Sequence, residues 1–264
     1  MELIDAIGQL HVPIEAKSDA ARIVSIVPSI TELLCDLGLA HSVVGRTGFC
    51  IHPVSVVKNI AKVGGTKDVN VEKIRRLAPT HLVVNIDENQ KPVVDMLSEF
   101  IPHVIVTHPV TPRDNLTLFR LLGGIFRVEE RAEELCAQFE RAYVQLPSVS
   151  THKTMLYCIW KDPWMTISAD TYIANMLGLI GWQAWTASSA TLASQKRYPV
   201  FEWDEVDLRQ IDGVLLSSEP YRFTQHHVLE LEQKIAKPVQ LVDGEMLSWY
   251  GSRAIAGLKY LRQC

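Results

Sequence analysis

Residues 22–38 read Arg-Ile-Val-Ser-Ile-Val-Pro-Ser-Ile-Thr-Glu-Leu-Leu-Cys-Asp-Leu-Gly, and this stretch decides the fold. Residues 23–27 have the composition of a short buried strand, which the following proline ends. Ser29 lies three residues before Glu32, a spacing that predicts a capped helix, and the closing glycine predicts its end. A strand, a tight corner and a helix place backbone N–H groups at the carboxyl end of a strand, where open α/β sheets bind ligands.

The composition limits the classes of function. The chain has 264 residues, of which 47% are hydrophobic, and a formal net charge of −4. This length suits one large domain or two domains of about 120 residues. No dense run of lysine and arginine indicates a nucleic-acid-binding face, and no apolar run approaches the roughly 18–20 residues that cross a membrane. The five scattered cysteines indicate neither a disulfide framework nor a structural zinc site.

The amino terminus bears on where the protein is found. The chain starts Met-Glu-Leu-Ile-Asp, which is acidic where a secretion leader is basic, and no long apolar core follows. We expect either a cytoplasmic protein or an exported protein whose leader is missing from this chain.

Patterns typical of strands and helices alternate along the first 111 residues. The expected strands cover residues 23–27, 42–45, 80–85 and 103–107. The expected helices cover residues 29–37, 71–77 and 93–100. Strands separated by single helices predict a parallel sheet with helices on both faces.

Residues 112–147 have a different pattern. Apolar residues recur there at roughly helical spacing, at Leu116, Phe119, Leu122, Phe126, Leu135, Phe139 and Tyr143. About thirty helical residues would span roughly 50 Å at 1.5 Å per residue, which suits a rod between two lobes. Gly123-Gly124 and Arg127-Val128 are the places where such a helix would bend or break.

The alternation resumes in residues 148–264. The expected strands there are 154–160, 213–217 and 239–242, and the expected helices are 172–180, 225–235 and 252–261. The sequence therefore predicts an α/β fold of two doubly wound lobes, residues 1–111 and 148–264. One long α-helix over residues 112–147 would join them, with a ligand cleft between the lobes.

In this order, the segments resemble the helical-backbone substrate-binding proteins of ABC importers for cobalamin and ferric siderophores. The resemblance covers nearly the whole chain and rests on residues 22–33, 63–65, 70–74, 77–84, 201–206 and 211–216. It is strongest to leaderless members of the family. These carry Phe-Cys-Ile-His-Pro, Gly-Gly-Thr-Lys and Asp-Gly-Glu-Met-Leu-Ser-Trp-Tyr-Gly-Ser-Arg, here at residues 49–53, 64–67 and 243–253.

The resemblance implies a solute-binding protein that is not an enzyme and carries no cofactor. It would hold a corrinoid or an iron chelate between its lobes for ABC-type import. It also implies a periplasmic location and a permease partner, whose arginines would receive one acidic residue from each lobe. Glu72 and Asp204 occupy the matching positions. The alternative for Glu72 is the first turn of a helix, where a negative charge is favoured.

Aromatic residues mark the expected ligand-binding surface of the second lobe, which holds all six tryptophans. Trp160 and Trp164 flank Lys-Asp-Pro just after a strand end, and Tyr172 opens the next helix. Indoles offer large, rigid contact surfaces for a flat macrocycle. The alternative for any one of these side chains is that it fills the core. Glu219, at another strand end, is expected to contribute to the same surface.

The loop of residues 243–253 follows the last expected strand and is rich in polar and aromatic groups. Its predicted ligand-binding residues are Glu245, Trp249, Tyr250 and Arg253. The guanidinium group of Arg253 suits a carboxylate or a phosphate on the ligand. The alternative is an ordinary strand–helix loop with a surface arginine.

Phe49, Cys50 and His52 lie in a loop after a strand of the first lobe. The resemblance places an aromatic residue against the ligand here, and Phe49 fits. Cys50 and His52 would suit a soft metal, with a third donor from Glu88, His108 or Glu245. Two residues do not make a metal site, so no metal is predicted.

Sequence motifs of common enzymes are absent. We find no Walker loop, no Gly-x-Ser-x-Gly elbow, no His-Glu-x-x-His and no dinucleotide-binding glycine pattern. Two alternatives to solute binding remain open at this point. One is a cytoplasmic enzyme or metal-handling protein that uses Cys50, His52 and Glu245, and the other is a module that binds only a protein partner.

Overall fold

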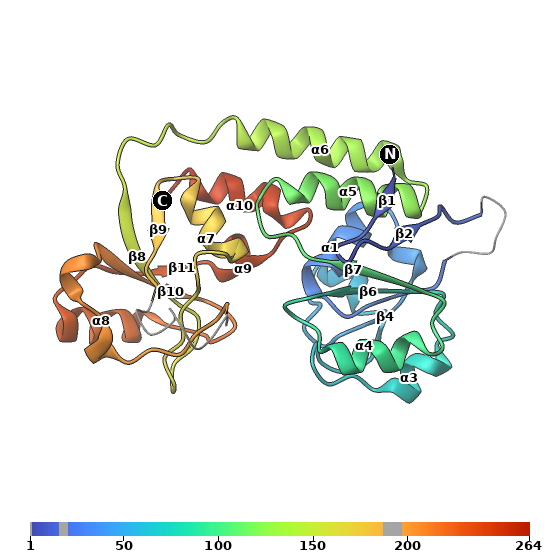
Figure 1. The fold of residues 1–264 in the computed structure, drawn as a ribbon, viewed down its shortest axis with the longest axis horizontal. Coiled ribbons are helices and arrows are strands. Elements are labelled where there is room, and N and C mark those ends of the chain that lie inside the picture. Colours follow the sequence, from blue (N-terminus) through green and yellow to red (C-terminus); the bar gives the residue numbers. More distant parts are fainter. Residues whose placement is uncertain (1, 16–20, 187–196) are drawn as a thin grey trace. The chain divides into compact units, whose positions relative to one another are not determined.

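The computed structural model describes residues 2–15, 21–186 and 197–264 (Figure 1). These residues form two compact units, so the predicted α/β fold of two lobes is confirmed. The first unit comprises Met1–Pro109, Arg113–Glu140 and Tyr250–Arg253. The second unit comprises Val110–Pro112, Arg141–Trp249 and Ala254–Cys264.

The first unit is built on a five-stranded sheet in which every neighbouring pair is parallel, in the order β5-β4-β3-β6-β7. The strands are β3 (Ile23–Ser25), β4 (Val43–Arg46), β5 (Ala61–Lys62), β6 (His81–Asn85) and β7 (His103–Thr107). The helices between them are α1 (Pro28–Asp36), η1 (Ala40–Ser42), α2 (Val54–Val57), α3 (Val71–Arg76) and α4 (Lys91–Ser98). Every residue of β6 is buried, as expected of a strand covered on both faces.

The start of α1 differs from the sequence prediction. The helix begins at Pro28 with Val27 as its N-cap, and no side chain caps it. Ser29 therefore lies inside the first turn, and its buried hydroxyl has no hydrogen-bond partner. The predicted pairing of Ser29 with Glu32 is wrong because the helix starts one residue earlier than expected. In α3, by contrast, Asn70 is the N-cap and accepts a hydrogen bond from the backbone N–H of Lys73 at 2.8 Å.

An antiparallel hairpin, which the sequence analysis did not predict, precedes the first sheet. Its strands are β1 (Leu3–Ile4) and β2 (Leu10–His11). The buried carboxylate of Asp5 accepts backbone hydrogen bonds from Ile7, Gln9 and Val106. Because Val106 belongs to the edge strand β7, this carboxylate fixes the hairpin to the end of the sheet.

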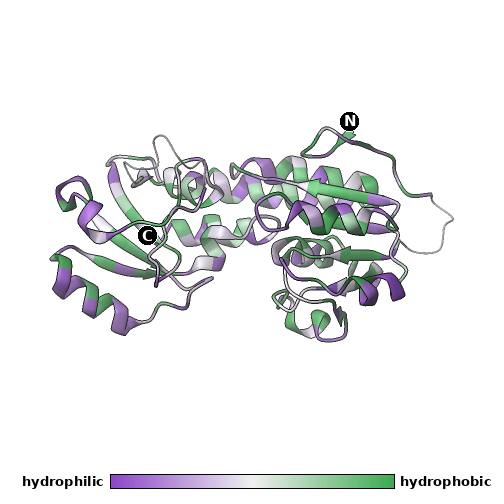
Figure 2. Cartoon of the chain, turned by 60° about the horizontal axis from the view of Figure 1, so that its bottom comes forward, coloured by the Kyte–Doolittle hydropathy of each residue, from purple (hydrophilic) through white to green (hydrophobic). Residues whose placement is uncertain are grey.

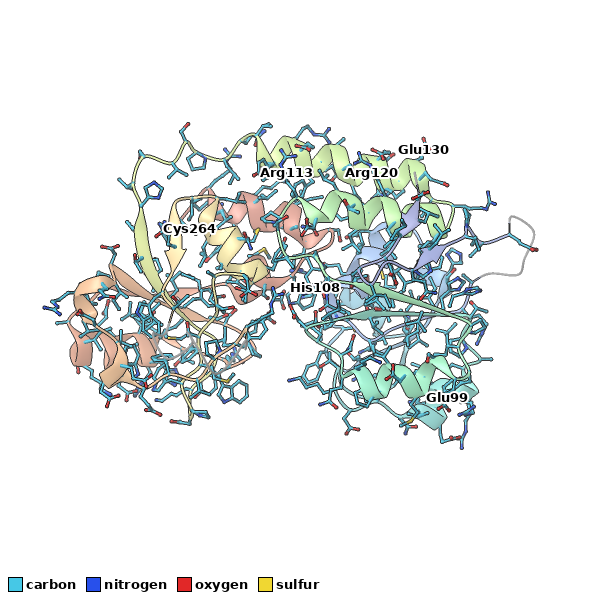
Figure 3. All side chains as sticks on the ribbon, viewed as in Figure 1. Glu99, His108, Arg113, Arg120, Glu130 and Cys264 are labelled. Atoms are coloured by element: carbon cyan, nitrogen blue, oxygen red, sulfur yellow. The ribbon has the colours of Figure 1, made fainter. Side chains whose placement is uncertain are left out.

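The predicted single helix over residues 112–147 is replaced by two helices, α5 (Asp114–Ile125) and α6 (Glu129–Tyr143). The helical conformation is interrupted at Arg127, whose φ is 55°. Arg113 pairs with Glu140 and Arg120 with Glu133, so the helices run antiparallel (Figures 1 and 3). The 50 Å rod is therefore wrong, because the segment folds back on itself.

A glycine allows this close packing of α5 against α6. A Cβ atom on Gly123 would lie only 2.5 Å from the Cβ of Ala132. The surrounding side chains are apolar and buried, as the periodicity predicted, and include Leu122, Leu135 and Phe139. The apolar pattern identified the helices correctly, but it did not show that they pack on each other.

The second unit has a four-stranded parallel sheet in the order β11-β10-β8-β9. The strands are β8 (Lys153–Cys158), β9 (Trp182–Ala184), β10 (Gly213–Ser217) and β11 (Val239–Val242). The helices are α7 (Tyr172–Gly178), η3 (Trp203–Glu205), η4 (Leu208–Gln210), α8 (Gln225–Ile235), α9 (Gly244–Ser248) and α10 (Arg253–Leu261).

Figure 2 shows polar and apolar residues interspersed along the helices, as expected where one helix face is buried. Within the described ranges, no helix is both long and apolar enough to span a bilayer.

Candidate functional site

The strands of the five-stranded sheet are all parallel, and so are those of the four-stranded sheet. Their carboxyl ends therefore lie at one edge of each sheet, which we call the carboxyl edge of that unit. Ligands of open α/β sheets bind at this edge. In the first unit it carries the loops after β3, β4, β6 and β7, and in the second unit the loops after β8, β10 and β11. Most of the residues predicted to bind a ligand lie in these loops.

The carboxyl edge of the first unit exposes an aromatic side chain. Phe49, in the loop after β4, is 62% exposed. Its ring lies beside the glycine turn after β5, where a Cβ atom on Gly65 would be 3.5 Å from the ring. Ile51 in the same loop, Val54 at the start of α2 and Ile86 after β6 are also exposed. Apolar side chains left in contact with water at this edge are available to pack against a ligand.

Cys50, in contrast, faces the interior. Its sulfur is fully buried and lies 3.1 Å from the hydroxyl oxygen of Thr31 and 3.2 Å from that of Thr47. Burial raises the pKa of this thiol, which disfavours the thiolate that a metal site needs. His52 is half-buried in the same loop. Within residues 2–15, 21–186 and 197–264, no three His, Cys, Asp or Glu side chains are grouped so as to hold a metal ion.

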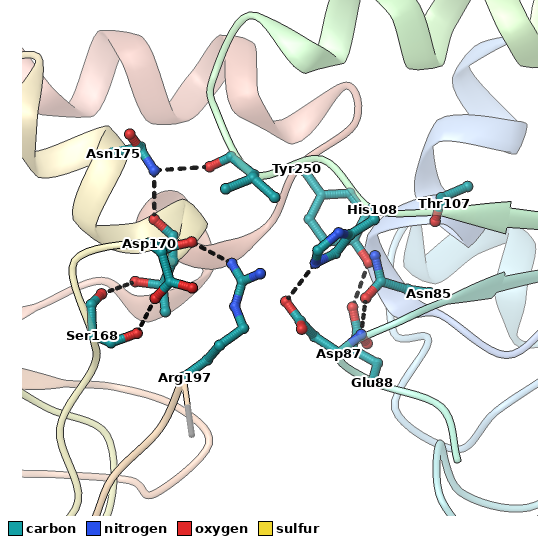
Figure 4. Close-up of polar contacts among 12 residues, drawn as sticks. Asn85, Asp87, Glu88, Thr107, His108, Ser168, Asp170, Asn175, Arg197 and Tyr250 are labelled. Atoms are coloured by element: carbon teal, nitrogen blue, oxygen red, sulfur yellow. Dashed lines mark hydrogen bonds and ion pairs between the residues drawn. The ribbon is translucent and has the colours of Figure 1, made fainter. Parts of the chain in front are cut away.

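Glu88 and His108, predicted as alternative metal donors, have other partners at the same edge (Figure 4). The Nε2 atom of His108 lies 3.4 Å from a carboxylate oxygen of Asp87. The hydroxyl group of Tyr250 donates a hydrogen bond to Glu88 at 2.5 Å. The side chain of Asn85 accepts a hydrogen bond from the backbone of Asp87 and holds the turn that carries both carboxylates.

Tyr250 belongs to a short segment, residues 250–253, that packs within the first unit. The N–H of Gly251 donates to the side chain of buried Asn115 at 2.6 Å. Arg253 forms a two-pronged ion pair with Glu32 of α1, with nitrogen–oxygen distances of 2.7 and 2.6 Å. Their side chains are only 11% and 15% exposed. A ligand anion at Arg253 would therefore compete with Glu32, a partner that the sequence analysis did not identify.

Of three aromatic residues predicted to bind a ligand in the second unit, one is exposed and two pack inside the unit. Trp160 is 39% exposed and contacts Tyr221 edge-to-face, with ring centroids 5.6 Å apart. Trp164 instead stacks on Phe223 at 5.7 Å and packs against the core. Tyr172 is buried in the first turn of α7, which Thr171 caps. The core-filling alternative thus describes Trp164 and Tyr172 but not Trp160.

The loop that leads into α7 is held by polar contacts of its own (Figure 4). The guanidinium group of Arg197 donates to the backbone carbonyl of Asp170. The Asp170 carboxylate in turn accepts a hydrogen bond from Ser168. The side chain of Asn175, one turn into α7, donates to the carbonyl oxygens of Thr171 and Val110. These contacts hold the start of the helix.

Glu219 is the centre of a hydrogen-bonded cluster at the carboxyl edge of the second unit. One carboxylate oxygen, Oε1, accepts hydrogen bonds from the Ser248 hydroxyl at 2.8 Å and from the indole N–H of Trp249 at 2.7 Å. The backbone carbonyl of Glu219 accepts another from Ser217 at 2.6 Å. Burial raises the pKa of this carboxyl group, and the charges of Glu245 and Asp243 raise it further.

The Glu219 cluster requires a glycine beside it. A Cβ atom on Gly244 would lie 2.6 Å from the Cγ of Glu219 and would also collide with the hydroxyl of Ser217. Gly244 starts α9, and its N–H donates to the side chain of Ser218. The sequence analysis named Glu219 and Trp249 as separate contributors, and the structure brings them into contact.

The comparison with known families identifies the fold. The sequence model of the periplasmic binding protein family matches residues 23–235. The chain belongs to this family. A curated relative, the ABC transporter substrate-binding lipoprotein YvrC of Bacillus subtilis, is 27% identical over 175 residues, or 62% of this chain. The match covers 55% of YvrC, so the chain spans about half the length of this relative.

Solved structures of periplasmic binding proteins have the same fold. The heme-binding protein RhuT of Roseiflexus sp. RS-1 superposes with a TM-score of 0.76 at 19% identity, covering 93% of this chain and 97% of RhuT. The vitamin B12 binding protein BtuF of Vibrio cholerae gives a TM-score of 0.75 at 17% identity, covering 92% and 96%. At these identities the likeness concerns the fold, and the resemblance to helical-backbone binding proteins is confirmed.

The two carboxylates predicted to dock on a permease are both exposed, one on each unit. Glu72 is in the first turn of α3, with its carboxylate 3.8 Å from Arg75. Asp204 is in the short helix η3. Their exposure leaves both carboxylates accessible to a basic partner.

A cavity of about 250 Å³ is located elsewhere in the first unit. It is lined by residues of the β1–β2 hairpin region, α5 and the start of α6, namely Leu3, Pro13, Arg120, Gly124, Glu129, Ala132 and Glu133. None of these residues belongs to a carboxyl-edge loop, and two of them, Arg120 and Glu133, pair with each other. We assign this cavity no part in ligand binding.

Proposed function

We propose that this protein is a solute-binding protein that holds a corrinoid or an iron chelate for ABC-type import, without chemical change to the ligand. The observation that carries the proposal is that each parallel sheet presents an exposed aromatic side chain in a loop at its carboxyl edge. Phe49 does so in the first unit and Trp160 in the second. Flat, apolar macrocycles bind by stacking on such side chains.

The relatives support this choice of ligand class. RhuT is described as a heme-binding protein and BtuF as a vitamin B12 binding protein. Both ligands are large, flat, metal-containing rings. A carboxyl edge that combines an exposed ring with a polar group, as Trp160 and Glu219 do in the second unit, suits a ring with polar side arms.

The proposal includes a partner and a location. ABC-type import requires a permease, and we propose that Glu72 and Asp204 dock on its basic residues. Separated carboxylates can match the spacing of positive charges on a partner and speed the encounter. The family description, periplasmic binding protein, favours a place outside the cytoplasmic membrane. Cell fractionation with an antibody to the chain tests the location.

The metal-handling alternative receives less support from the site. Cys50 is buried, its pKa is raised, and its sulfur contacts two threonine hydroxyls. We therefore retain solute binding as the single proposed function.

The test is a binding titration followed by tryptophan fluorescence. All six tryptophans belong to the second unit, so a ligand that stacks on Trp160 should quench part of the emission. Cyanocobalamin, dicyanocobinamide, hemin and a ferric catecholate are the probes, with thermal melting as a second measurement. Saturable quenching that is lost in Trp160→Ala supports the proposal. No quenching and no rise in melting temperature with any probe would overturn it.

A further inference from the structure

One oxygen of the Glu219 carboxyl group accepts hydrogen bonds within the described part of the protein, and the other does not. Both hydrogen bonds from Ser248 and Trp249 go to Oε1. Among the described residues, Oε2 makes no hydrogen bond, and it is not among the buried polar atoms that lack a partner. Oε2 is therefore partly accessible to solvent at the carboxyl edge of the second unit.

The surroundings hold this open oxygen in place. Ser248 and Trp249 fix Oε1, Ser217 fixes the backbone carbonyl of Glu219, and Tyr157 donates to the hydroxyl of Ser217 at 3.0 Å. Any side chain at position 244 would collide with this arrangement. A carboxylate that is already held by two hydrogen bonds at Oε1 loses little conformational freedom when it binds, so a hydrogen bond to Oε2 is favourable.

The charge at this position is negative. The charged groups that act on Glu219 are the carboxyl groups of Glu245 and Asp243. Lys161, in the loop after β8, is 3.6 Å from Glu230 of α8, and their ion pair offsets its charge. A ligand group that carries its own carboxylate would meet like charge here, whereas an N–H group would meet an acceptor.

We propose that Oε2 of Glu219 accepts a hydrogen bond from an N–H group of the ligand and thereby selects amide-bearing rings over carboxylate-bearing rings. This inference rests on the proposed function and narrows its ligand class. The ligand accordingly carries carboxamide or amine side arms toward the second unit. A ring whose side arms are free carboxylates is rejected at this position.

The substitution Glu219→Gln replaces the hydrogen-bond acceptor at Oε2 with a donor and keeps the hydrogen bonds from Ser248 and Trp249. Ser248 and Trp249 both donate, so the glutamine amide must present its oxygen to them and its NH₂ group outward. The acceptor that faces the ligand then becomes a donor. The matched control is Glu130→Gln, at an exposed position on α6 of the first unit (Figure 3). It removes the same charge from a helix that is not part of a carboxyl-edge loop.

The experiment compares two corrinoids with the same ring. Dicyanocobinamide carries amide side arms, and dicyanocobyrinic acid carries carboxylates in their place. We expect the wild-type protein and Glu130→Gln to bind the amide form at least about tenfold more tightly. Glu219→Gln should reduce this ratio by about tenfold or more, with an unchanged melting temperature. Ser248→Ala, which removes one anchor, should reduce the ratio by a smaller factor.

The failure of this inference differs from the failure of the proposed function. Equal ratios in wild-type protein and Glu219→Gln would overturn the role of Glu219, as would tighter binding of hemin or dicyanocobyrinic acid than of dicyanocobinamide by the wild type. In either case solute binding itself would stand. If no ring of any kind bound, the proposed function would fall, and this inference with it.

Discussion

Acidification should destabilise the first unit through His81. This side chain is the first residue of β6 and is only 6% exposed. Its ring stacks on that of His103 at 4.8 Å and contacts Phe126 at 5.1 Å. Burial, followed by the nearby charges of His103 and His11, lowers the pKa of His81 from 6.5 to about 4. The folded unit therefore keeps this imidazole neutral.

The sign and size of the effect follow from proton linkage. The folded state has the lower pKa, so the unfolded state takes up the proton first as the pH falls. Stability from the neutral ring is fully present above pH 6.5 and is lost as the pH falls to about 4. At roughly 1.4 kcal/mol for each tenfold difference in proton affinity, the loss is of order 3 kcal/mol.

The assay is hydrogen exchange of peptides that cover β6 and β7, corrected for the intrinsic exchange rate at each pH. Tryptophan fluorescence is unsuitable because all six indoles belong to the second unit. His81→Phe keeps a ring against His103 and Phe126 but cannot be protonated, so it should lose about 3 kcal/mol less than the wild type between pH 6.5 and 4. His226→Gln, at an exposed position on α8, is the control. Equal pH dependence in wild type and His81→Phe would refute the reasoning.

Three further predictions concern stability and are checked by urea unfolding. Arg253→Met leaves the half-buried carboxylate of Glu32 without its cation and should lower the free energy of unfolding by about 3 kcal/mol. Adding Glu32→Gln removes the unpaired charge and should restore part of this loss. Equal free energies of unfolding for the single and double variants would contradict this prediction. Gly251→Ala forces a side chain onto a residue with φ of 75° and 3.2 Å from Leu33, which should cost about 1–2 kcal/mol, and an unchanged midpoint would count against it. Trp164→Ala should destabilise the second unit by about 3–5 kcal/mol, unlike Trp160→Ala, and similar losses in the two variants would disprove the assignment of Trp164 to the core.

The sequence predicted the elements that have a strong local pattern. The buried strands after residues 22, 80 and 212 and the helices around residues 71–77 and 225–235 were found within a few residues, because apolar periodicity reports burial directly. The cap at Asn70 likewise depends on neighbouring residues alone. These features carry the fold class and the position of the carboxyl edges.

Contacts between distant residues could not be predicted in this way. Glu32 and Arg253 are 221 residues apart in the chain, and no spacing rule connects them. The pairing of α5 with α6 depends on a backbone break at Arg127 and on the missing side chain of Gly123. Periodicity showed that the segment is helical but not that it turns back. Cys50 likewise lies in a loop where a ligand could bind, but its side chain is buried and faces the interior.

The loop of residues 243–253 shows why a dense group of polar residues is weak support for a binding site. Asp243 caps α9, Trp249 holds Glu219, Tyr250 holds Glu88, and Arg253 holds Glu32. These groups therefore serve the fold, and a ligand that used them would have to displace their partners. The Oε2 atom of Glu219 differs, since its anchors bind the other oxygen and leave it open. An acceptor that the fold positions but does not use is a stronger indication of a ligand contact than the number of polar residues around it.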